Sequence, residues 1–202
     1  TMQEHKQEAS EVLKELRAKH PDYASYKITR LIVSSLVDSG EVDQGYEEAN
    51  KWITKYSKAP APAANPSDKN LKDKNAAAQA APAPLGGPNP KEVADLANII
   101  NYGGRPELAL QLIEPQHAII TSDADLFLAY VNASINANKS DQAYEVLKAT
   151  YDQGKLQVPL YRPFIELAME RGEMELAERI VDSLDSRYFT EDEAINLIEL
   201  AR

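Results

Sequence analysis

One short pattern recurs in this chain at a fixed interval of 34 residues. Three stretches carry it: YGGRPELALQLIE from residue 102, NANKSDQAYEVLK from residue 136 and ERGEMELAERIVD from residue 170. Each has an alanine at the same place, with a Gly or Asn five positions before it and an aliphatic residue four positions after it. The alanines are Ala109, Ala143 and Ala177, preceded by Gly104, Asn138 and Gly172 and followed by Ile113, Leu147 and Val181.

The pattern predicts a unit of two helices joined by a tight turn. Gly and Asn are the residues that best accept the left-handed backbone conformation that ends a helix. Before each of them, apolar residues recur at helical spacing, which predicts a first helix. These residues are Val93, Leu96, Ala97 and Ile100; Phe127, Tyr130, Val131 and Ile135; and Tyr161, Phe164, Ile165 and Ala168. The small alanine that opens the second helix allows the two helices to approach closely.

Helix start signals agree with this division. Asn89 precedes a first-turn proline, Pro90, which is the arrangement of an N-cap. Ser122 and Asp125 have the Ser-x-x-acid form, and Thr190 with Glu193 forms a predicted capping box. Pro115 falls inside the second helix of its unit, where we expect it to kink or shorten that helix.

A helical hairpin of 34 residues with a small residue opening its second helix resembles the tetratricopeptide repeat. The usual Trp, Gly and Tyr of the first helix are replaced here, so the resemblance rests on the period and on the register of small residues. It implies an all-α fold, a right-handed solenoid of helical hairpins. Residues 90–202 are then three hairpins followed by a final helix, which begins near Thr190.

Residues 1–57 fit the same template. Ala9 takes the small position of a second helix, which Pro21 ends. Gly40 is then the stop and Gly45 the small position of a complete hairpin. The chain is thus expected to begin with half a repeat, and a tetratricopeptide segment taken from a longer protein remains one interpretation.

The interval from Gly40 to Gly104 is one repeat plus 30 residues, and an Ala/Pro-rich insert accounts for the excess. Residues 59–90 hold ten alanines and seven prolines and show no apolar periodicity. Such a composition predicts a disordered or semi-flexible tether over residues 58–89. A recognition segment that folds back on the helices or binds a partner is the other reading of the same residues.

Charge and composition exclude several function classes. The formal net charge is −10, and residues 91–202 alone carry 20 acidic and 10 basic side chains. An acidic surface repels nucleic acid, which favours a basic or neutral protein partner. Cysteine is absent, which removes thiol chemistry and cysteine-bound zinc. No apolar run is long enough to predict insertion into a membrane. The compartment stays open between cytoplasm and bacterial periplasm, and the oligomeric state stays open too.

No constellation predicts catalysis, a metal or a cofactor. The histidines are His5, His20 and His117, none at a ligand spacing. The glycine pairs lack the strand and lysine of a phosphate-binding loop. Acidic pairs such as Asp123 and Asp125 lie in predicted first turns, where the helix dipole accounts for them. We therefore expect a protein that is not an enzyme.

The resemblance implies a binding surface on the first helices, which line the concave groove of tetratricopeptide arrays. Asn98 and Asn132 occupy the same groove place in successive repeats, and an amide can hydrogen-bond the backbone of an extended peptide. Arg162 could hold a carboxylate through two hydrogen bonds. The candidate residues are Asn98, Asn101, Asn132, Asn136, Arg162 and Glu166. A solvated helix face is the plain alternative for all of them. The family's carboxylate clamp needs a lysine where Ala94 stands, so that function is not implied.

The sequence thus favours a scaffold or adaptor that binds a partner protein or an extended peptide. Two alternatives remain: a regulatory segment of a larger enzyme, and a pentatricopeptide-like module that binds RNA, which the acidic charge opposes.

Overall fold

The computed structural model describes residues 25–57 and 88–183, together with residues 11, 12, 15 and 19. Within these ranges the chain is all-α and contains no strand. Ala9 and Pro21 of the first predicted helix, residues 58–87 of the insert, and the predicted capping box and final helix from Thr190 lie outside the described residues.

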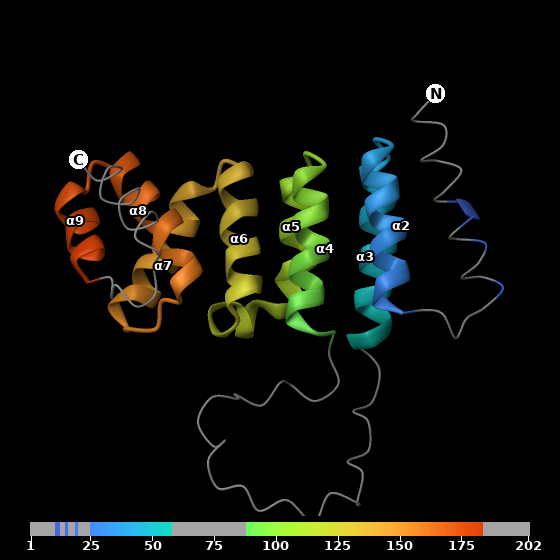
Figure 1. The fold of residues 1–202 in the computed structure, drawn as a ribbon, viewed down its shortest axis with the longest axis horizontal. Coiled ribbons are helices and arrows are strands. Elements are labelled where there is room, and N and C mark those ends of the chain that lie inside the picture. Colours follow the sequence, from blue (N-terminus) through green and yellow to red (C-terminus); the bar gives the residue numbers. More distant parts are fainter. Residues whose placement is uncertain (1–10, 13–14, 16–18, 20–24, 58–87, 184–202) are drawn as a thin grey trace, which may run out of the picture.

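The helices pack in pairs along the chain. The pairs are α2 (Tyr26–Asp38) with α3 (Val42–Ser57), α4 (Pro90–Tyr102) with α5 (Pro106–Ile113), α6 (Ala124–Asn136) with α7 (Ser140–Asp152), and α8 (Tyr161–Glu170) with α9 (Met174–Asp182). Two 3-10 segments, η2 (Glu114–Ser122) and η3 (Val158–Leu160), lie between pairs. Figure 1 shows the pairs side by side in chain order along the long axis of the molecule.

Each hairpin turn has the left-handed residue that the sequence predicted. The φ angle is +88° at Gly40, +81° at Gly104, +57° at Asn138 and +78° at Gly172. The residue that follows each of them donates its backbone N–H to a carbonyl in the last turn of the first helix; for Lys139 the acceptor is Ser134, at 2.8 Å. These turns satisfy carbonyls that the helix end would otherwise leave unpaired.

The helix-breaking effect of Pro115 is confirmed. Helix α5 ends at Ile113, and the chain continues as η2 until Ser122. The expected cap at Ser122 is wrong by one residue. Asp123 has the extended backbone that an N-cap needs, and its Oδ1 accepts the N–H of Leu126 at 2.9 Å.

The hairpins on the two sides of the insert pack together. Helix α4 contacts both α2 and α3, and α5 contacts α3. At this seam Gly103 has no room for a side chain, because a Cβ there would lie 2.8 Å from Cγ1 of Val37 and 3.0 Å from Cγ1 of Val42. An ion pair between Arg105 Nη2 and Asp43 Oδ2, 2.6 Å apart, spans the same seam.

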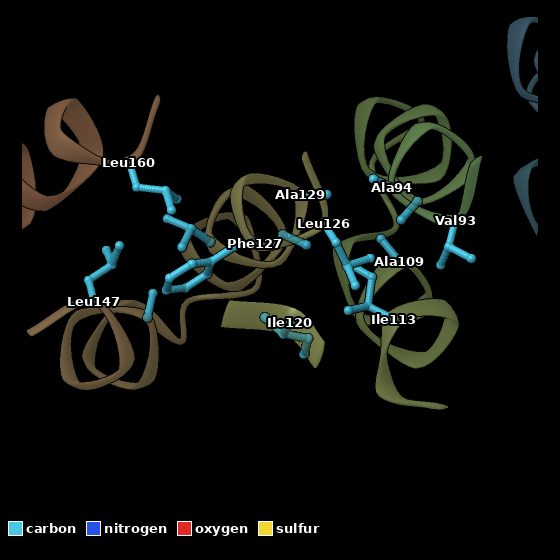
Figure 2. Packing of buried hydrophobic residues seen from close by; sticks show 14 of the residues in the cluster. Val93, Ala94, Ala109, Ile113, Ile120, Leu126, Phe127, Ala129, Leu147 and Leu160 are labelled. Carbon is cyan, nitrogen blue, oxygen red and sulfur yellow. The ribbon is translucent and has the colours of Figure 1, made fainter. Parts of the chain in front are cut away.

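One apolar core runs through the stacked hairpins, and α6 lies in its middle. Neighbouring residues of α6 point in opposite directions: Leu126 faces Ala109 and Ile113 of α5, whereas Phe127 faces Leu147 and Leu160 (Figure 2). Both side chains are fully buried. The predicted small positions Ala109, Ala143 and Ala177 are all 0% exposed. Helix α6 is therefore covered on both sides by its neighbours.

Candidate functional site

We call the side of the molecule formed by the first helix of each hairpin the first-helix side. A hollow of about 530 Å³ opens there, where the first helices α2, α4 and α6 of three successive hairpins meet. Helix α2 contributes Tyr26 to its walls, and α6 contributes Asp125 and Leu128. The rest comes from α4 and its N-cap: Asn89, Lys91, Glu92, Ala94, Asp95 and Asn98. In this hollow, Asn98, one of the predicted groove asparagines, lies together with charged side chains from two hairpins.

The wall between α2 and α4 is fixed by Asp95. The Tyr26 hydroxyl donates to Oδ2 of Asp95, and Arg30 Nε lies 2.6 Å from the same oxygen. Burial, together with this hydrogen bond, raises the pKa of Tyr26 above its ordinary value. The bond to Asp95 also raises the pKa of Arg30. The aromatic ring of Tyr26 packs against Trp52, with centroids 5.5 Å apart.

The first turn of α4 forms the floor nearest to α6. Asn89 Oδ1 accepts the N–H of Lys91 at 3.0 Å, as its predicted cap role requires. Lys91 extends to α6, where its Nζ lies 3.4 Å from Oδ2 of Asp125. Burial raises the pKa of Glu92, whereas a hydrogen bond from the Asn89 backbone acts in the opposite direction. The floor therefore carries one lysine among carboxylates.

The four candidate asparagines divide into two kinds. Asn98 is half-buried and lines the hollow, and Asn132 is half-buried at the equivalent place on α6. Asn101 is only 5% exposed, and its Oδ1 accepts a hydrogen bond from Nδ2 of Asn136 at 3.0 Å. Asn101 and Asn136 thus connect α4 to α6, whereas the side chain of Asn98 is presented to the hollow.

The other two candidates lie on α8. Arg162 Nε and Glu166 Oε1 are 3.0 Å apart, one helical turn from each other, and their side chains are 73% and 40% exposed. They pair with one another at the surface and do not line the hollow. Their exposure leaves them accessible along the same row of first helices.

Sequence reasoning missed Tyr26 and Asp95 as site residues. Their contact spans 69 residues and crosses the insert. Asp95 also lies one place beyond the groove position held by Ala94. The 34-residue period places residues within a repeat, but it does not say which side chain of the preceding hairpin meets them.

Two further hollows lie on the side formed by the second helices, α5 and α7, which we call the second-helix side. They lie near the break at Pro115 that shortens α5. They measure about 270 Å³ and about 1120 Å³, and both are lined by His117, Ile120 and Tyr130. Tyr130 belongs to α6, whereas His117 and Ile120 belong to η2, which packs against α6. Neither hollow contains any of the residues that the sequence singled out for binding.

Among residues 25–57 and 88–183, no group of three or more His, Cys, Asp or Glu side chains is placed to hold a metal ion. No helix in the described part of the chain is long and apolar enough to cross a membrane.

Comparisons with protein-family models, with curated proteins and with solved structures gave no match.

Proposed function

We propose that this chain is a non-enzymatic interaction module, a tetratricopeptide-like solenoid that binds a partner protein as an extended segment along its first helices. The observation that carries the proposal is the hollow shared by α2, α4 and α6, because it presents Asn98 between neighbouring hairpins. Hairpins stacked in one dimension expose a long continuous face, which suits an extended ligand.

In this proposal, Asn98 and Asn132 contact the peptide backbone. Their amides supply both donors and an acceptor, so they bind a main chain without selecting its sequence. The places of Asn136, Arg162 and Glu166 extend the same face toward α8, whereas Asn101 supports Asn136 from behind through their hydrogen bond. The face thus has positions for backbone contacts at successive repeats.

The test is a binding experiment with the double variant Asn98→Ala and Asn132→Ala. Captured partners of the wild-type chain would be identified from an extract by mass spectrometry, and the affinity of an identified segment would then be measured by calorimetry. We expect the double variant to lose about 10-fold or more in affinity, because a net hydrogen bond contributes about 1 kcal/mol. Helix content by circular dichroism should stay unchanged.

A matched control is the pair Gln142→Ala and Gln153→Ala, which removes two exposed amides from α7 and its C-cap on the second-helix side. Equal affinity of the Asn98/Asn132 variant and the wild type would place the binding surface elsewhere. Salt-sensitive retention of single-stranded RNA in a filter assay would instead favour the RNA-binding alternative.

A further inference from the structure

The hollow on the first-helix side has both apolar and charged residues in its lining. Leu128 contributes aliphatic surface and Tyr26 contributes an aromatic ring, whereas Ala94 is only 2% exposed. Glu92, Asp95, Asp125 and Lys91 are its charged residues. Three carboxylates against one ammonium group leave the lining with a negative formal charge. Long basic side chains have the matching shape, since their alkyl stems lie on apolar surface while their charged heads reach polar groups.

Two carboxylates of the hollow already contact cations of this chain. Arg30 lies 2.6 Å from Asp95, and Lys91 lies 3.4 Å from Asp125. The Lys91 side chain is 75% exposed, so its pair with Asp125 is weak and easily exchanged. Lys91 thus marks a position where an ammonium group fits among the carboxylates, and a cation from outside can take its place.

We propose that this hollow receives a Lys or Arg side chain of the bound partner. The alkyl stem lies on Leu128 and the ring of Tyr26, and the charged head lies among Asp125, Glu92 and Asp95. The inference rests on the proposed function, because an extended segment along the first helices brings its side chains to the hollow. It adds a requirement that backbone contacts by Asn98 do not make, namely a basic residue at one place in the partner.

The probe is a set of fluorescein-labelled decapeptide libraries that differ only in the fixed central residue. That residue is Lys, Arg, norleucine or Glu, and the other positions are randomised. Fluorescence anisotropy with the full chain measures each affinity at low and at physiological salt. We expect the Lys and Arg libraries to bind about 3- to 10-fold more tightly than the norleucine library, and the Glu library to bind most weakly. Added salt should reduce the difference.

The variant Lys91→Ala distinguishes this inference from a structural role of the same residues. Removal of the resident cation frees Asp125 and abolishes a repulsion, so the Lys and Arg libraries should bind about 3-fold more tightly. The norleucine library should be unaffected. The control Lys139→Ala removes an identical charge from the second-helix side and should change no preference.

The converse variant is Asp95→Asn with Asp125→Asn, which should bring the Lys and norleucine libraries to equal affinity. Its control is Glu107→Gln on the exposed surface of α5. If circular dichroism shows that the Asp95→Asn, Asp125→Asn variant is unfolded, the Lys91→Ala variant alone tests the inference. Equal binding of all four libraries to the wild type would overturn this inference and leave the peptide-binding proposal standing. Failure of every library to bind would count against both.

Discussion

The glycines at the end of α4 show two different reasons for the same residue. At Gly103 the reason is space, because a Cβ would lie 2.8 Å from Val37 Cγ1. At Gly104 the reason is conformation, because φ is +81° and no heavy atom lies within 4 Å of the Cβ position. Asn138 holds the equivalent turn position at φ +57°, which indicates that Asn is tolerated there.

These two reasons predict that Ala and Asn rank in opposite order at the two positions. Gly103→Ala should lower the free energy of unfolding by about 1–3 kcal/mol, since valine rotamers adjust poorly, and Gly103→Asn should cost more. Gly104→Ala should cost about 1 kcal/mol through backbone strain, and Gly104→Asn should cost less than Gly104→Ala. Urea unfolding of the four variants measures this order. If Asn lowered the free energy of unfolding more than Ala at both positions, the steric reason at Gly103 could not be separated from the conformational reason at Gly104.

At the scale of elements, a cluster of charged side chains joins α7 to the turn before α9. Glu173 Oε2 accepts a hydrogen bond from the Tyr144 hydroxyl at 2.5 Å, and Lys148 Nζ lies 3.6 Å from the same oxygen. Arg171 lies over the ring of Tyr144, 4.4 Å from its centroid. The hydrogen bond from Tyr144, with smaller contributions from Lys148 and Arg171, holds the pKa of Glu173 below its ordinary value.

A lowered pKa fixes the sign of the pH dependence. The stabilising contribution of Glu173 is present above the pKa of the unfolded chain and is lost as the pH falls through the lower pKa of the folded chain. Glu173→Gln should therefore unfold at lower urea concentration than the wild type at pH 7. The two midpoints should converge as the pH falls below the lowered pKa of Glu173, where the wild-type carboxyl is protonated. Glu178→Gln, an exposed change of equal charge on α9, is the control. A gap that stayed constant with pH would assign Glu173 a role in packing alone.

Local chemistry explains which elements were predictable from the sequence. The turn residues, the small positions of the described hairpins and the break at Pro115 each depend on one residue and its near neighbours, and they appear where expected. The start of α8 at Tyr161 and the cap at Asp123 depend on how the preceding 3-10 segments end. The hollow depends on how α2 meets α4, and the spacing of residues within a repeat does not determine which residues meet between hairpins. Asn98 was therefore predictable as a site candidate, whereas Tyr26 and Asp95 were not.

At the scale of the whole molecule, the seam between α2/α3 and α4/α5 decides whether the chain behaves as one unit. The seam holds Gly103 against Val37 and Val42, the pair Asp43–Arg105, and the bond from Tyr26 to Asp95. Packed neighbouring hairpins stabilise one another through such contacts, whatever the length of chain between them.

We therefore expect the hairpins on both sides of the insert to stay associated after the chain is cut between them. A site-specific protease sequence in place of residues 68–74 allows that cut, and size-exclusion chromatography at micromolar concentration measures the outcome. The two pieces should elute together, because the close approach of Val37 and Val42 to Gly103 does not involve the insert. Gly103→Leu should separate them, since the larger side chain occupies the space of both valines. Separation of the pieces already in the unsubstituted chain would mean that the tether, and not the packed seam, holds the hairpins together.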